Sequence, residues 1–64
     1  MKIGDKLKEA RIKKGLTQKQ VASEIQTTIQ QISKYETGEQ EPTASRLKEL
    51  CKLYGVSADE ILNL

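Results

Sequence analysis

The sequence contains no histidine, tryptophan or phenylalanine, and it has only one cysteine and one proline among its 64 residues. A structural zinc site is built from four ligands, chiefly cysteine and histidine, which a single thiol cannot supply. One cysteine also excludes a disulfide within a monomer. We therefore predict that the protein binds no metal and needs no other cofactor. Cys51 is interpreted as a small buried apolar residue, with a reactive thiol as the alternative.

Long apolar runs are missing as well. No stretch approaches the ~20 residues that a membrane-spanning helix requires, and no signal-peptide core is visible, so we expect a cytoplasmic protein. An enzyme is poorly supported, because the sequence shows no pair of nucleophile and base and a chain this short does not easily enclose a pocket. We expect one domain, residues 1–64, which buries only ~60% of its unfolded surface. Oligomerisation is the remaining way to add stability.

Charge is distributed unevenly, although the formal net charge is only +2. Residues 1–35 hold eight basic and three acidic side chains, whereas residues 36–64 hold three basic and six acidic ones. A polyanion would be attracted to the first half and repelled from the second. The asymmetry supports a nucleic-acid partner, although a solvated basic helix would give the same balance.

Two segments begin with the same helix-start signal, a threonine followed three residues later by a glutamine. In such a capping box the threonine hydroxyl accepts a hydrogen bond from a free backbone N–H, and the glutamine side chain reaches back to the N–H of the cap. Apolar residues at helical spacing follow each cap. The boxes Thr17–Gln20 and Thr28–Gln31 thus predict helices at about 18–25 and 29–36, separated by a turn at Gln26-Thr27.

Similar patterns predict three further helices. Ile3, Leu7 and Ala10 form a buried stripe on a first helix that Gly15 ends. Ser57 and Glu60 repeat the capping box before a short last helix that runs through Leu62. Between them, Thr43 can cap a helix at 44–54 that places Leu47, Leu50, Cys51 and Tyr54 on one face.

The outer face of the segment 29–36 carries side chains that can read DNA bases. Glutamine can pair with adenine through two hydrogen bonds, and lysine can donate to O6 and N7 of guanine. Gln30 and Lys34 are four residues apart and share this face. Ile29 can contact a thymine methyl, whereas Gln31 is divided between the base edges and its capping role. These four residues are the predicted base-reading set.

Phosphate contacts are expected around the helix starts. The helix dipole and free N–H groups at the start of the segment 18–25 favour an anion. Such contacts position a protein on DNA without distinguishing sequences. The candidates are Gln18, Lys19, Thr28, Ser33 and the hydroxyl of Tyr35, for which a core ring with a solvated hydroxyl is the alternative.

An ordered set of motifs runs along the chain: Arg11, Gly15–Gln18, Val21-Ala22, Ile32–Glu36 with Gly38, Pro42, Leu50, Gly55–Ser57 and Asp59–Leu62. This set resembles the phage Cro and repressor family of DNA-binding proteins, the XRE family. The resemblance implies an all-α fold, a compact five-helix lambda-repressor-like domain with a core at 7–61 and a helix-turn-helix at about 18–37. It also implies a transcriptional repressor that binds a two-fold operator on double-stranded DNA as a homodimer, with an antitoxin or protein-interaction module as the alternative.

Residue by residue, the family's base-reading positions fall on Ile29, Gln30 and Lys34. An arginine in the first helix of the family commonly pairs with a glutamate at the end of the recognition helix, which implies a pair between Arg11 and Glu36. Two independent surface charges are the alternative for this pair. The family's C-terminal end often contributes to a dimer, and we assign Tyr54, Leu62 and Leu64 to that interface.

The sequence departs from the family in the turn and in the loop after the second motif helix. Gln26 stands where the family usually has a glycine, because that residue often adopts a left-handed conformation, and Thr27 replaces an apolar residue. The loop carries Glu39 and Glu41 where many relatives have basic residues that hold phosphates. Either this loop faces away from DNA or the affinity is modest.

Overall fold

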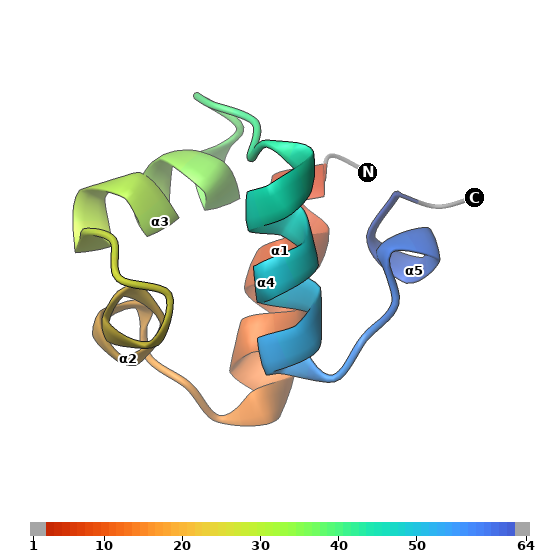
Figure 1. The fold of residues 1–64 in the computed structure, drawn as a ribbon, viewed down its shortest axis with the longest axis horizontal. Helices are drawn as coiled ribbons and strands as arrows, with labels where there is room; N and C mark the ends of the chain where they lie inside the picture. The colour runs from red at the N-terminus through yellow and green to blue at the C-terminus, as the bar shows by residue number, and fades with distance from the viewer. Residues whose placement is uncertain (1–2, 63–64) are drawn as a thin grey trace.

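Five short helices joined by tight turns form the part of the chain that the structure, a computed structural model, describes, residues 3–62. Within that range all regular structure is helical, which confirms the all-α, five-helix expectation. In Figure 1, α2 and α3 lie at one end of the molecule, α5 lies at the other, and α1 and α4 lie between them. The helices are α1 (Ile3–Lys14), α2 (Gln18–Glu24), α3 (Ile29–Thr37), α4 (Ala44–Tyr54) and α5 (Ala58–Leu62).

Local signals set the helix ends. The hydroxyls of Thr17, Thr28 and Thr43 each accept a hydrogen bond from the backbone N–H three residues later, so each threonine caps the helix that it precedes. Gly15 follows the last residue of α1 with a φ of 78°, in the left-handed region that glycine adopts without steric cost. The predicted starts of α2, α3 and α4 and the predicted end of α1 are therefore confirmed.

The core lies between the five helices and draws at least one side chain from each. The predicted stripe on α1 is buried at Leu7 and Ala10, with Ile3 partly buried beside it. Burial raises the pKa of the Cys51 thiol, which agrees with its interpretation as a small apolar residue. The buried apolar residues are Leu7, Ala10, Val21, Ala22, Ile25, Ile32, Tyr35, Leu50, Cys51, Tyr54 and Ile61.

Tyr54 belongs to this core, and its assignment to a dimer interface was wrong. Only 5% of the residue is exposed, because the face of α4 that carries it packs inside the domain. Leu62 is 38% exposed and remains available to a partner. Leu64, the third residue of that prediction, lies outside the described residues.

Gly4 lets α1 approach α3 closely. A Cβ atom at this position would lie 2.5 Å from the backbone oxygens of both Tyr35 and Glu36. Any side chain here would push α1 away from the C-terminal end of α3. The sequence analysis did not identify this requirement, because it arises from a contact between residues more than thirty positions apart.

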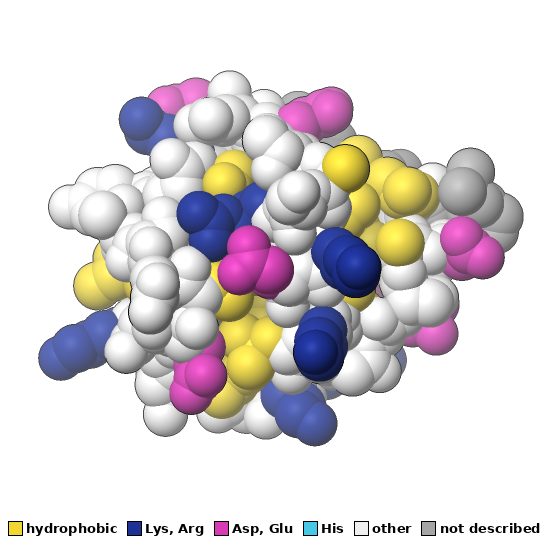
Figure 2. All heavy atoms as spheres, viewed as in Figure 1, with side chains coloured by type: hydrophobic (Ala, Val, Ile, Leu, Met, Phe, Trp, Pro, Cys, Tyr) yellow, Lys and Arg dark blue, Asp and Glu magenta, His cyan; other side chains and the backbone are white. Residues whose placement is uncertain are grey.

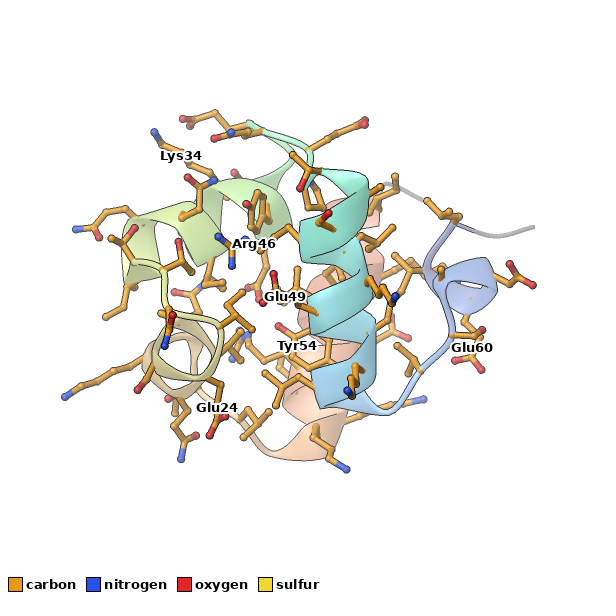
Figure 3. The ribbon with its side chains drawn as sticks, in the orientation of Figure 1. Glu24, Lys34, Arg46, Glu49, Tyr54 and Glu60 are labelled. Carbon is orange, nitrogen blue, oxygen red and sulfur yellow. The ribbon has the colours of Figure 1, made fainter. Side chains whose placement is uncertain are left out.

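The turn between α2 and α3 contains one residue in a left-handed conformation and is hydrogen-bonded to α4. Gln26 adopts a φ of 57°, the left-handed conformation that the family comparison implied, at a cost of up to ~1–2 kcal/mol for a residue with a Cβ. Arg46 on α4, labelled in Figure 3, donates a hydrogen bond from Nη1 to the backbone oxygen of Ile25 at 2.8 Å. This bond satisfies a carbonyl at the end of α2 that the helix itself leaves free. α2 ends one residue earlier than predicted, at Glu24.

Candidate nucleic-acid interface

Helix α3 has one face in the core and one face in solvent. Ile32, Tyr35 and Glu36 are buried on the inner face. On the outer face Gln30 and Lys34 are exposed, and Ile29 is 44% exposed even though it is a large apolar residue. In Figure 3 the Lys34 side chain extends from α3 away from the body of the domain. The helix thus presents amide, ammonium and methyl groups outward together.

A largely buried polar cluster, Arg11, Gln18 and Glu36, fixes the inner face. Arg11 donates from Nε to Glu36 Oε2 at 2.7 Å and from Nη2 to Oε1 at 3.2 Å. Gln18 Nε2 donates to Glu36 Oε1 at 3.0 Å. The Arg11 and Glu36 side chains are only 12% and 4% exposed, so the expected pair is formed as a buried, bidentate contact and not as two separate surface charges. The cluster joins α1, α2 and α3.

The electrostatics of this cluster extend to α4. The hydrogen bonds from Arg11 to the Glu36 carboxylate raise the pKa of the guanidinium, against the opposing effect of burial. Burial raises the pKa of Tyr54 to about 12, and the Glu36 carboxylate adds to that shift while Arg11 opposes it. Both groups therefore keep their usual protonation state in the fold, with Arg11 charged and Tyr54 neutral.

The hydrogen bond to Glu36 limits the phosphate contact that was predicted for Gln18. Its amide nitrogen, assigned to a phosphate from the sequence, donates to Glu36, and the residue is half-buried. An amide has two N–H groups, so one remains for another acceptor. Lys19 and Thr28 are exposed nearby, and Ser33 is half-buried on α3.

Tyr35 is a core residue. It is 7% exposed, and its ring lies among the buried apolar side chains, as the core-ring interpretation expected. A phosphate contact through its hydroxyl stays a prediction. The spacing of Ile32 and Tyr35 had already placed both residues on the inner face of α3.

The two Thr-x-x-Gln boxes behave differently. At α2 the box is closed, because Thr17 Oγ1 accepts from the Gln20 backbone at 3.0 Å and Gln20 Oε1 accepts from the Thr17 N–H at 2.8 Å. At α3 only the threonine half is formed, with Gln31 N donating to Thr28 Oγ1 at 3.1 Å. The Gln31 side chain instead donates from Nε2 to Gln40 Oε1 at 2.9 Å. The predicted full box at α3 was wrong, and Gln31 is free of the backbone.

The loop after α3 also approaches Lys34. The Lys34 Nζ atom lies 4.0 Å from Glu39 Oε2, and the side chains of Lys34 and Glu39 are 49% and 68% exposed. Such an exposed ion pair contributes only about 0–1 kcal/mol, so the lysine can exchange this partner for another anion at little cost. Glu39 in the acidic loop therefore lies beside the outer face of α3. If that face binds DNA, the alternative of a loop that faces away from DNA does not hold for Glu39.

The surface over α2 and α3 is mostly polar and uncharged. In Figure 2 much of this end of the molecule is white, and charges of both signs lie at its margins, including Glu24 of α2, which Figure 3 labels. The only acidic residue within α3 is Glu36, which points inward and is paired. A polyanion approaching the outer face therefore meets hydrogen-bonding groups and Lys34, with the acidic Glu39 beside that lysine.

Residues 3–62 offer neither a metal site nor a membrane-spanning helix. Those residues contain no group of three histidine, cysteine, aspartate or glutamate side chains in an arrangement that could hold a metal ion. None of the five helices combines the length and the hydropathy of a membrane span.

Comparison with known proteins identifies the family. A helix-turn-helix family model matches residues 7–61. The chain is 40% identical over 62 residues to the HTH-type transcriptional regulator ImmR of Bacillus subtilis, covering 97% of this chain and 49% of that protein. It is 36% identical over 63 residues to the HTH-type transcriptional activator BcrR of Enterococcus faecalis, covering 98% and 31%.

A third relative is the SPbeta prophage-derived HTH-type transcriptional regulator YonR of Bacillus subtilis, which is 39% identical over 60 residues, with 94% of this chain and 56% of that protein covered. The chain thus spans about half or less of the length of most of these relatives. The family match covers both motif helices and the helices that hold them in place. The chain belongs to the helix-turn-helix family of the phage Cro and repressor type.

Proposed function

We propose that the protein is a sequence-specific DNA-binding transcriptional regulator that inserts α3 into the major groove. The observation that carries the proposal is the division of α3 into a buried, paired inner face and an exposed outer face with Ile29, Gln30 and Lys34. The second helix of such motifs lies in the major groove with its N-terminal residues at the base edges. The relatives named as transcriptional regulators support the same function.

Base reading falls to the outer face of α3. Gln30 can form two hydrogen bonds with adenine, and Lys34 can donate to a guanine after leaving Glu39. Ile29 offers an apolar surface to a thymine methyl. Gln31 joins this set because its amide is not bound to the backbone.

Phosphate contacts come from the groups around the two helix starts. Lys19 is exposed on the first turn of α2, where the dipole also favours an anion. The remaining N–H of Gln18 and the hydroxyls of Thr28 and Ser33 can donate to phosphate oxygens. These contacts set the register of α3 in the groove without reading sequence.

We further propose that two copies bind a two-fold operator through an interface at the α5 end. A groove of about 500 Å³ lies between α4 and α5, with an apolar floor that includes Leu47, Val56 and Leu62. In Figure 2, yellow side chains show through between these helices beside dark blue ones. Lys48 and Lys52 line the groove on α4, whereas the first turn of α5 is acidic. A two-fold axis that lays α5 of one copy against α4 of its partner pairs these charges.

The shape of the domain suits this arrangement. α3 and α5 lie at opposite ends of the long axis in Figure 1, and the domain measures 28 Å along that axis. With an axis at the α5 end, the distance between the two α3 helices therefore exceeds one domain length. This distance is of the same order as the ~34–36 Å between successive major grooves on one side of the duplex. Occupation of such an operator within a promoter would repress transcription.

Selection of bound sequences from a random DNA pool tests the proposal most directly. We expect an enriched two-fold sequence with half-sites one turn apart, and an affinity that falls with salt at a log–log slope near −0.9 for each phosphate neutralised. A reporter gene placed behind the selected site then shows the sign of regulation. Absence of enrichment together with a flat salt response would exclude DNA as the ligand.

A protein-interaction module or antitoxin is the second candidate. The apolar groove between α4 and α5 favours it, because the same surface could receive a different protein instead of a second copy. A pull-down of the product of the neighbouring gene, run beside a gel shift on the upstream DNA, separates the two functions. Leu62→Glu should abolish whichever protein contact exists while leaving the α3 face unchanged.

A further inference from the structure

The loop between α3 and α4 folds back onto the outer face of α3. The backbone N–H of Gln40 donates to the Lys34 oxygen at 3.2 Å, which fixes the loop against the end of the helix. From that position the Gln40 side chain accepts the hydrogen bond from Gln31 Nε2 at 2.9 Å. Gln31 is half-buried, whereas Gln30, the preceding residue on α3, is exposed and has no side-chain hydrogen bond among the described residues.

The chemistry of the pair leaves Gln31 able to read a base. A glutamine amide has two N–H groups and one carbonyl oxygen. After one N–H is given to Gln40, the other N–H and the carbonyl oxygen remain. Adenine requires this combination, because its N7 accepts one hydrogen bond and its N6 donates one. Gln40 therefore restrains Gln31 without consuming the groups needed for recognition.

We propose that Gln40 is a specificity-determining positioning residue, which holds the Gln31 amide so that the two glutamines read one adenine as a unit. The proposal rests on the proposed function, since it assumes that α3 enters the major groove. Its physical basis is preorganisation, because a side chain that is already restrained loses less conformational freedom on binding. Restraint also discriminates between bases, since a fixed amide cannot rotate to suit a different pattern of donors and acceptors.

Two substitutions at Gln40 separate positioning from other effects. Gln40→Leu removes the acceptor for Gln31 at similar size. Gln40→Glu keeps an acceptor for the Gln31 N–H but adds a negative charge near the DNA backbone. Binding is measured on the operator obtained by selection and on three variants of it that carry each other base at the position read by Gln31. That position is the one where Gln31→Ala abolishes base preference.

For Gln40→Leu we expect preference for adenine over the other bases at that position to fall roughly two- to tenfold, the range expected when one side chain loses its restraint. Preference at the position read by Gln30 should not change. For Gln40→Glu we expect binding to all four sequences to weaken equally, so that the preference for adenine is retained. In the background of Gln31→Ala, Gln40→Leu should have no further effect on base preference.

Thermal unfolding of each variant, followed by circular dichroism, identifies any change in the fold. If Gln40→Leu lowers affinity equally on all four sequences or alters only the melting temperature, Gln40 merely supports the loop and the proposal is wrong. A Gln31 position that prefers a base other than adenine in the unsubstituted protein also overturns it, although DNA binding stands. Failure of the unsubstituted protein to select any sequence removes the proposed function as well.

Discussion

Helix α3 has hydrogen-bonded polar side chains on both of its faces, and the two sets differ in almost every physical respect. The inner cluster of Arg11, Gln18 and Glu36 is largely buried, contains several hydrogen bonds and joins three helices. The outer set joins α3 only to the loop that follows it, through Gln31–Gln40 and Lys34–Glu39, in solvent. Charged groups that are buried must keep their partners, whereas exposed ones exchange them readily. The inner cluster can therefore hold α3 in place while the outer set remains free to bind.

The largest effect should come from breaking the inner cluster. Glu36→Ala leaves the largely buried Arg11 guanidinium without its carboxylate partner, with only the Leu16 backbone oxygen still accepting from it. The free energy of unfolding should fall by up to about 3–5 kcal/mol. Glu39→Ala in the outer set should change it by less than about 0.5 kcal/mol. Urea unfolding followed by circular dichroism measures both. Equal losses for the two variants would contradict the division between the faces. The double variant Arg11→Met, Glu36→Leu should be more stable than Glu36→Ala.

The inner side should also respond to alkaline pH. The pKa of Tyr54 is raised from 10.0 to about 12 in the fold, so the neutral phenol is favoured there. Its contribution is fully present below pH 10 and is lost as the pH rises toward 12, by about 2–3 kcal/mol in total. Urea unfolding of the protein and of Tyr54→Phe over this range measures the difference. A tyrosinate absorbance titration in which Tyr54 ionises near pH 10 would contradict the burial argument.

Substitutions on the outer side should affect binding and leave stability unchanged. Gln30→Ala and Lys34→Ala should each weaken binding to the selected operator by about 1–3 kcal/mol and relax preference at one or two base pairs. Fluorescence anisotropy with labelled duplexes measures the affinities, and urea unfolding provides the control. An unchanged site preference in the double variant would remove these residues from the reading set.

The smallest effect tests the two capping boxes. Gln20→Ala opens the closed box at α2 and should cost about 0.3–1.5 kcal/mol of stability. Gln31→Ala removes a side chain that bonds to the loop instead of its own cap, so its cost should be smaller, within about 0.5 kcal/mol. Thermal unfolding of the two variants gives the comparison. A larger loss for Gln31→Ala would mean that the Gln31–Gln40 bond supports the fold and not only the reading surface.

Much of the fold could be predicted because its signals are local. A threonine cap and its N–H donor are three residues apart, and the stripe of Leu7 and Ala10 follows from helical spacing alone. The sequence therefore contains nearly all the information that sets where the helices begin. The Arg11–Glu36 contact spans 25 positions, and it was predicted from the resemblance to the family.

The remaining errors and omissions concern contacts that reach beyond one turn of a helix, to the next loop or to another helix. The same Thr-x-x-Gln pattern gives a closed box at Thr17 and an open one at Thr28, where the Gln31 side chain is instead directed to the loop and donates to Gln40. Tyr54 was correctly placed on the same face of α4 as Leu50 and Cys51, but it was assigned to a dimer interface, and its burial within the monomer was not predicted. The base-reading residues remain predictions, since their exposure is necessary for binding without being sufficient.

The hydrogen bond from Arg46 to the backbone oxygen of Ile25 has a consequence for protein engineering. Residues 18–37 cannot be treated as a portable cassette, because the carbonyl that finishes α2 is satisfied by a guanidinium from α4. A designer who transplants this pair of helices onto another scaffold must supply an equivalent donor at that corner. Without it, the angle between the transplanted helices would be set by the host and not by the sequence of the insert.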